Sequence, residues 1–203
     1  SDIGYISGNN GVMVKSTNGG LNWNSQSSGT GNTLYGVDFL NSNIGAACGT
    51  QKILLTTNGG NSWITQSISF FPFSQVLSIA QLDSNTVVGI CTSTNGLFYK
   101  TTDAGLNWTS TSLEIPLIFN GSSDIVRGMS FADTNTGMIV CDLGSILRTT
   151  NAGNNWTRDS SFIPSSYIRL RVFSDVDMLN TNTALACGGG GTTQPEPTAA
   201  TSG

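Results

Sequence analysis

Few side chains in this sequence can do acid–base, nucleophilic or metal chemistry. The chain has 203 residues, with 12 Asp and Glu, 8 Lys and Arg, four cysteines and no histidine. The absence of histidine excludes a Ser-His-Asp triad, a histidine base and a His-ligated zinc site. The groups that remain are carboxylates, which can work in pairs as general acid and base. The candidates are Asp38, Asp124, Asp133, Asp175 and Asp177.

The four cysteines raise the question of disulfides, because an even number favours them in a secreted protein. Each cysteine, however, ends a similar short apolar segment in one of four repeated units. Equivalent positions of neighbouring units are expected to lie beyond the ~7 Å Cα separation that a disulfide allows. We therefore predict no disulfide and four free, buried thiols. They are Cys48, Cys91, Cys141 and Cys187.

The composition excludes several classes of protein. Charged residues make up 10% of the chain, against roughly 25% in an ordinary soluble domain. A sequence pI near 4.4 leaves no basic surface for a phosphate backbone, which argues against nucleic-acid binding. No apolar run approaches the ~20 residues of a membrane span. No carboxylate spacing matches a calcium loop, so we expect neither a metal nor a cofactor.

Four segments of eight residues repeat one pattern along the chain. Each begins with Ser or Thr, carries Asn or Asp at its third position and Gly at its fifth, and ends with Trp. The segments are residues 16–23, 56–63, 101–108 and 149–156. Their tryptophans lie 40, 45 and 48 residues apart and are all the tryptophans of the chain. A period of this size indicates an array of similar structural units.

Each unit contains the signals of four short strands. The first strand includes the Val-Asp-Phe-Leu type of run, the second ends at Cys, the third enters the repeated segment and the fourth begins at Trp. No helical periodicity interrupts them, which is typical of an all-β protein. Four strands every 40 to 48 residues are the period of a propeller blade. We predict an all-β β-propeller of four-stranded blades, with about four units present.

The eight-residue pattern resembles the Asp-box, also called the bacterial neuraminidase repeat. The wider unit looks most like the photosystem II stability/assembly factor-like propellers, which also occur in secreted and surface proteins of bacteria. The resemblance runs from residue 3 to about residue 188. Three of the four copies depart from the Asp-box name, because Asn18, Asn58 and Asn151 replace the aspartate that only Asp103 keeps.

We interpret the repeated residues as structural. The hydroxyl and the Asx side chain can bond backbone groups inside the turn, the glycine permits positive φ, and the tryptophan packs between strands. Identical motifs on every blade cannot all face one site. The residues are Ser16, Asn18, Gly20, Trp23, Thr56, Asn58, Gly60, Trp63, Thr101, Asp103, Gly105, Trp108, Thr149, Asn151, Gly153 and Trp156.

A glycosidase is the alternative that the resemblance brings with it. Sialidases with this box use three arginines and a Tyr/Glu pair, but here Glu114 and Glu196 are the only glutamates, and Arg148 stands at a repeated surface position. Xyloglucanases with similar repeats use paired aspartates, but Asp38 and Asp177 recur in phase with the repeat. We therefore predict a non-enzymatic protein without catalytic residues. A glycan-binding or glycan-hydrolysing propeller remains the alternative.

Variation between the units points to a binding face. The connections from one unit to the next lengthen along the chain and carry apolar residues, and in a propeller they emerge beside the turns between second and third strands. An apolar shared face favours a protein partner or neighbouring repeats. The predicted contact residues are Phe70, Phe71, Phe73, Ile115, Phe119, Phe162 and Tyr167. A structural repeat module of a large adhesin or filament is a third hypothesis.

The organisation of the chain is expected to be simple. Residues 1–187 hold the repeats, and residues 188–203 have the Gly/Thr/Pro-rich composition of a loop or linker. The repeats can close as a four-bladed ring or form an arc of a larger propeller, commonly seven-bladed in the resembled family. We favour the arc, because the last second strand has no place in the ring. The charge-poor, Ser/Thr/Asn-rich composition favours a secreted or cell-surface protein.

Overall fold

The computed structural model describes residues 2–67, 75–92, 96–115, 117–118, 122–158 and 171–190. Its strands form five main antiparallel sheets in chain order. The first is β1 (Gly4–Ser7), β2 (Val12–Ser16) and β3 (Asn24–Ser27), with a short 3-10 helix, η1 (Asn9–Gly11), after β1. The second is β4 (Leu34–Phe39), β5 (Gly45–Gly49), β6 (Lys52–Thr56) and β7 (Ile64–Ser67). The third is β8 (Val76–Gln81), β9 (Val87–Cys91), β10 (Leu97–Thr101) and β11 (Thr109–Ser112).

The remaining strands complete the described structure. The fourth sheet is β14 (Val126–Phe131), β15 (Gly137–Cys141), β16 (Ile146–Thr149) and β17 (Thr157–Arg158), and the fifth is β18 (Arg171–Asn180) with β19 (Thr183–Gly190). A small ribbon joins β12 (Leu117–Ile118) to β13 (Ser122–Ser123). In the described parts of the chain, no helix has the length and apolar character needed to cross a membrane.

Composition decides which strands lie inside each sheet. The second strands β5 and β9 are runs of small and apolar residues that are buried throughout, as expected of strands covered on both faces. The fourth strands β3 and β11 consist of Ser, Thr, Asn and Gln and are largely exposed. Polar side chains on short outer strands protect the open edge of each sheet from pairing with other chains.

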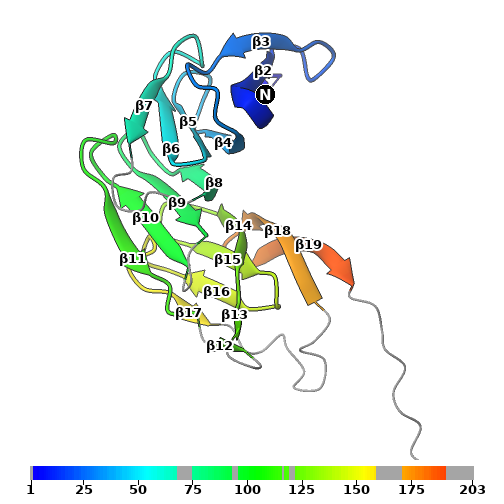
Figure 1. Cartoon of the computed structure of the whole chain (residues 1–203), viewed down its shortest axis with the longest axis vertical. Coiled ribbons are helices and arrows are strands. Elements are labelled where there is room, and N and C mark those ends of the chain that lie inside the picture. Colours follow the sequence, from blue (N-terminus) through cyan, green and yellow to red (C-terminus); the bar gives the residue numbers. More distant parts are fainter. Residues whose placement is uncertain are drawn as a thin grey trace, which may run out of the picture.

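The five sheets follow one another along a curved arc, with β4, β8, β14 and β18 on its concave side (Figure 1). These four strands are called the inner strands below. Within the described residues, β18 pairs with β19 and not with β1, so it does not complete the first sheet. The four-bladed ring is therefore wrong, and the predicted arc of antiparallel sheets is confirmed, with three of the described sheets four-stranded.

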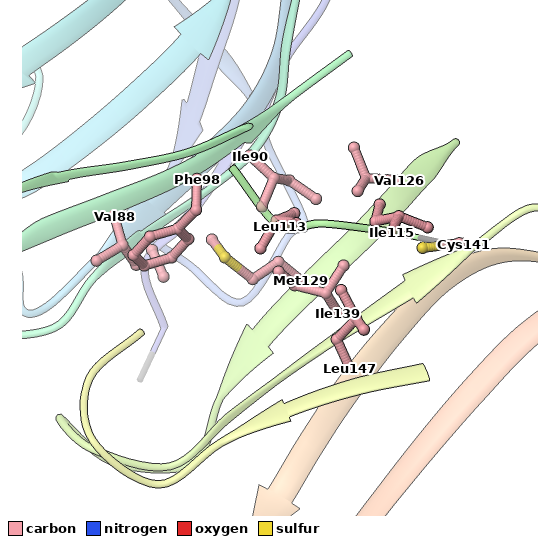
Figure 2. Packing of buried hydrophobic residues seen from close by; sticks show 11 residues of the cluster. Val88, Ile90, Phe98, Leu113, Ile115, Val126, Met129, Ile139, Cys141 and Leu147 are labelled. Carbon is pink, nitrogen blue, oxygen red and sulfur yellow. The ribbon is translucent and has the colours of Figure 1, made fainter. Parts of the chain in front are cut away.

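Apolar clusters lie between successive sheets. The largest joins the third sheet to the fourth, where Phe98 of β10 packs near Met129 of β14 and Leu147 of β16 (Figure 2). Leu113 and Ile115 follow β11 and complete this cluster. Ile115 is 3% exposed, so it is a core residue rather than the exposed contact residue predicted from the sequence. Ile115 lies in the core because it packs against the apolar side chains of this cluster. Removing its side chain from water stabilises the fold more than leaving it exposed at the surface would.

The repeated eight-residue turn has the same hydrogen bonds in every copy. The hydroxyl of Thr56 donates to Asn58 Oδ1 at 3.0 Å and accepts the Gly60 N–H at 3.0 Å, while Asn58 Oδ1 accepts the Ser62 N–H at 3.0 Å. The other three copies make equivalent bonds. The acceptor is one side-chain oxygen, so Asn and Asp both serve. The fifth-position glycines have φ between 77° and 88°, where glycine carries no steric penalty.

The cysteines do not share one repeat position. Cys48 pairs with Gly36 of its inner strand, whereas Cys91 pairs with Val76 and is therefore one position further along. Neighbouring residues of a strand face opposite sides of the sheet, so the shift by one position turns Cys91 towards the second sheet while Cys48 faces the third. Both side chains therefore lie in the cluster between these two sheets. All four cysteines lie in the described residues and none is disulfide-bonded; Cys48, Cys91 and Cys141 are buried. Cys187 is exposed, contrary to the expectation of four buried thiols, because the part of the chain that the structure describes contains no sheet beyond β18 and β19.

A cation just before the repeated turn ties each sheet to the next at three junctions. Lys15 Nζ donates to Gly59 O at 2.9 Å, and Lys100 Nζ donates to Ala152 O at 2.9 Å. Arg148 donates to Thr181 O at 2.9 Å. The interpretation of Arg148 as a surface residue is therefore incomplete, because its guanidinium bridges the fourth and fifth sheets.

The last strand extends beyond the predicted end of the repeats. The strand β19 runs through Gly190 and pairs Phe173 with Gly188 and Val172 with Gly189. The first glycines of the predicted loop or linker are thus part of the fifth sheet. Residues 191–203 lie outside the described residues.

The single aspartate among the repeated turns makes one prediction about acid stability. The N–H of Asn107, its side-chain amide and the Thr101 hydroxyl hold the pKa of Asp103 below its ordinary value. A lowered pKa adds stability above the unfolded-state pKa, and this stability is lost as the pH falls through the folded-state pKa. Between about pH 6 and about pH 2, we expect the Tm of Asp103→Asn to fall by less than the Tm of the parent protein. Equal losses in a thermal melt would contradict the role given to this carboxylate.

Thiol labelling tests the placement of the cysteines. Burial raises the pKa of the Cys48 thiol well above its ordinary value, and burial together with Asp124 and Asp142 does the same for Cys141. Protonated, buried thiols react slowly. In the native protein we expect a thiol reagent to modify Cys187 first, and Cys187→Ser to remove this fast phase. Fast labelling of Cys48 or Cys141 in Cys187→Ser, located by mass spectrometry, is the outcome that contradicts the placement.

Candidate functional site

A large groove lies on the concave side of the arc. It has a volume of about 980 Å³ and is lined by the four inner strands with the hairpin after β14. Its walls come from residues as far apart as Tyr35 and Asp177. The groove carries four carboxylates and one guanidinium. They are Asp38, Asp133, Asp175, Asp177 and Arg127.

Hydrogen bonds between neighbouring inner strands hold the groove together. Asp38 Oδ2 of β4 accepts the Gln81 N–H of β8 at 2.8 Å. At the equivalent position of β14, Ser130 Oγ accepts the Met178 N–H of β18 at 3.0 Å. Ala80 occupies this position in β8, and there Ser78 Oγ donates to Met129 O at 3.2 Å instead. The side chains that face the groove therefore also fix the spacing of its walls.

Tyr35 and Arg127 occupy the second position of their inner strands and lie at one rim of the groove. Tyr35 is 39% exposed, and Thr50 Oγ1 donates to its hydroxyl at 3.5 Å. Arg127 forms an ion pair with Asp142 at 2.8 Å. Burial alone would raise the pKa of Asp142, but the Ile125 N–H, Asp124 and Arg127 together hold it below its ordinary value.

Backbone hydrogen bonds place this rim beside the connections between sheets. Thr50 N–H donates to Thr33 O at 3.0 Å, and Asp142 N–H donates to Ile125 O at 2.9 Å. Each bond joins a turn between second and third strands to the connection that enters the same sheet. The two kinds of segment therefore share one side of the arc, as the sequence predicts. The predicted contact residues Phe70, Phe71, Phe73, Phe119, Phe162 and Tyr167 lie outside the described residues.

The candidate carboxylates that line the groove each accept hydrogen bonds from the protein. Asp38 also accepts the Phe39 N–H at 2.9 Å, and burial raises its pKa against the effect of these bonds. Asp133 accepts two N–H groups of its hairpin, which hold its pKa below the ordinary value. Asp175 accepts the Val176 N–H at 2.9 Å, and Asp177 accepts the Ser130 hydroxyl at 3.3 Å. The structure brings these four residues to one groove, and each also caps a backbone or side-chain donor.

Asp124 does not reach the groove. Its side chain is 0% exposed, and its two oxygens accept the Leu143 N–H at 2.6 Å and the Ser145 N–H at 3.0 Å. Burial is the main cause that raises its pKa, and the nearby Asp142 raises it further. This carboxylate closes the turn between β15 and β16 and has no access to a substrate.

The sequence did not indicate Tyr35 and Arg127 as site residues. Both stand at a variable position of the inner strand, occupied by Leu77 in β8 and Ser174 in β18. The sequence could have indicated them by this variation, because the position recurs in every inner strand while its residue type differs from one unit to the next. Within the described residues, no three His, Cys, Asp or Glu side chains group in a way that would hold a metal ion.

Comparisons with known proteins agree with the architecture. The family model described as Photosynthesis system II assembly factor YCF48 matches residues 21–163. YCF48 from Cyanidioschyzon merolae is similar with a TM-score of 0.65 at 13% identity, over 94% of this chain and 65% of that one. No curated protein matches the chain in sequence.

Two further solved structures share the fold. The GH74 xyloglucanase from Xanthomonas campestris is similar with a TM-score of 0.65 at 13% identity, over 94% of this chain and 34% of that one. The β-propeller domain of Cps50 (Swd1) from Myceliophteria thermophila has a TM-score of 0.63 at 7% identity, over 92% of this chain and 59% of that one. The chain spans less than two thirds of each of these structures. At such identities the likeness shows the fold, which is a β-propeller.

Removing the Asp124 carboxylate tests its structural role. Asp124→Ala leaves two N–H groups of the β15–β16 turn without their acceptor, and each loss costs about 1–3 kcal/mol. We expect a loss of about 2–4 kcal/mol in the free energy of unfolding, measured in denaturant, and a smaller loss in Asp124→Asn, which keeps one acceptor. A fully stable Asp124→Ala would show that the turn does not depend on this side chain.

Proposed function

Because the chain belongs to the family of the photosynthesis system II assembly factor YCF48, we propose that it is a non-enzymatic propeller that binds a protein partner. The observation that carries the proposal is the concave groove with its exposed rim at Tyr35 and Arg127. The partner contacts this rim together with the connections that emerge beside it. The function is that of a binding or assembly scaffold.

The use of the carboxylates supports a scaffold over a hydrolase. A glycoside hydrolase needs two carboxyl groups that flank the scissile bond, one of them free to donate a proton. Here Asp38 and Asp133 accept backbone N–H groups, and Asp124 is enclosed. The repeat explains these contacts, since Asp38 and Ser130 occupy the same position and each accepts a backbone N–H of the next inner strand.

The rim has the mixed character of a protein-binding surface. Tyr and Arg are, together with Trp, enriched among the residues that carry most of the binding energy at protein interfaces. The guanidinium of Arg127 is exposed, while Asp142 is half-buried, so a partner carboxylate can approach the guanidinium from the solvent side. The charge-poor, Ser/Thr/Asn-rich composition supports an extracytoplasmic location.

A binding experiment with matched variants tests the proposal. The chain is used as bait in an extract of its source cells, and the affinity of a recovered protein is then measured by calorimetry. We expect the double variant Tyr35→Ala, Arg127→Ala to bind at least about tenfold more weakly, because hot-spot side chains contribute 2 kcal/mol or more. Leu21→Ser, which changes an 82% exposed residue outside the groove, is the control and keeps full affinity.

Two outcomes would contradict the proposal, the first its contact site and the second its non-enzymatic character. One is unchanged affinity in the rim variant, which would place the contact elsewhere. The other is hydrolysis of a xyloglucan or sialoside by the parent protein that disappears in Asp175→Asn, because that carboxylate is exposed in the groove. The folded state of each variant is checked by its thermal melt.

A further inference from the structure

The junction between the second and third sheets differs from its sister junctions. At the position of Lys15, Lys100 and Arg148, the second sheet carries Leu55. Its cross-strand neighbour is Ile64, whereas the cations pair with polar residues of the fourth strand. Those polar neighbours are Asn24, Thr109 and Thr157. Of the four junctions between the described sheets, this is the one at which an apolar pair replaces a cation–polar pair.

The carbonyl that the missing cation would have reached is present and similarly held. Gly59, Ala104 and Ala152 are the fourth residues of their repeated turns, with φ of 67°, 55° and 58°. Their N–H groups donate to the backbone carbonyls of Asn43, Asn85 and Asn135 at 2.8, 2.9 and 2.9 Å. The Gly59 and Ala152 carbonyls each accept a lysine ammonium at 2.9 Å. Among the described residues, the Ala104 carbonyl accepts no such donor.

Exposure follows the presence of the cation. Gly59 is buried and Ala152 is half-buried, while Ala104 is exposed. A hollow of about 80 Å³ lies beside Ala104 and is lined by Leu55, Ile64 and Val87 among others. Ile64 is 65% exposed, and Leu106 of the same turn as Ala104 is 83% exposed. The junction therefore offers an apolar wall next to a carbonyl acceptor.

We propose that this hollow, called the Leu55 pocket, takes a lysine side chain from a protein partner. The four-carbon stem lies over Leu55 and Ile64, and the ammonium donates to the Ala104 carbonyl, as Lys15 and Lys100 do within the chain. A lysine suits such a site because its stem covers apolar surface while its charged end bonds polar groups. The net charge of −4 favours the approach of a basic partner. The inference does not depend on the groove, because Gln81 is the one lining residue that the two sites share.

A small probe isolates the lysine chemistry. The probe is n-butylammonium, and the readout is the amide resonance of Gly105, which follows the Ala104 carbonyl. We expect a saturable shift in the millimolar range, the affinity of about −4 kcal/mol that so small a ligand can reach. Trimethylbutylammonium has the same stem and charge but no N–H donor, and it should bind at least about tenfold more weakly.

Variants distinguish the pocket from general charge attraction. Leu55→Lys places a lysine where the sister junctions have one, so it should abolish the shift. Leu21→Lys adds the same charge at an 82% exposed residue and should leave the shift unchanged. Lys100→Leu should create a second site, seen at the Gly153 amide. The Tyr35→Ala, Arg127→Ala variant should bind the probe like the parent, which separates this site from the groove.

The proposal is overturned by any of three results. They are the absence of a saturable shift at Gly105, an equal shift with trimethylbutylammonium, and an unchanged shift in Leu55→Lys that melts like a folded protein.

Discussion

The structure depends on the face-to-face packing of sheets that are apolar on both sides. A strand such as β5 or β9 is buried throughout, so neither sheet can stand alone in water and each needs a neighbour on both faces. The clusters around Phe98 and Tyr99 belong to successive junctions and supply this cover. Burial of apolar surface at about 25 cal/mol per Å² makes the row of sheets, rather than the single sheet, the stable unit.

Polar contacts then set the spacing and orientation that apolar packing leaves open. The inner strands are joined through Asp38 and Ser130, and the peripheral turns through Lys15, Lys100 and Arg148. These bonds recur because the repeat places the same groups opposite one another at each junction. A junction that departs from the pattern keeps the packing but leaves a polar group or a hollow available. This is why variation within the repeat, as at Leu55 and Tyr35, is where recognition can develop without loss of the fold.

The same reasoning explains the carboxylates. An aspartate whose carboxylate accepts backbone N–H groups contributes more to the stability of the fold than an aspartate that is bonded to water alone. Asp124 is the extreme case, fully enclosed and bonded to two N–H groups of one turn. The groove therefore has acidic walls in which Asp38 and Asp133 already accept backbone N–H groups. The chain belongs to the YCF48 family.

The sequence by itself determined the local and periodic features of this protein. The four tryptophans and the turns before them predict the all-β repeat, because the bonds of each turn join residues at most four apart. The tertiary structure alone decided which face Cys48 and Cys91 present, what Arg148 binds, and that Ile115 enters the core. Strand register decides the first, and a shift of one residue reverses the face. The groove was equally beyond local reasoning, because Tyr35 and Asp177 meet on its walls only after the sheets have stacked into an arc.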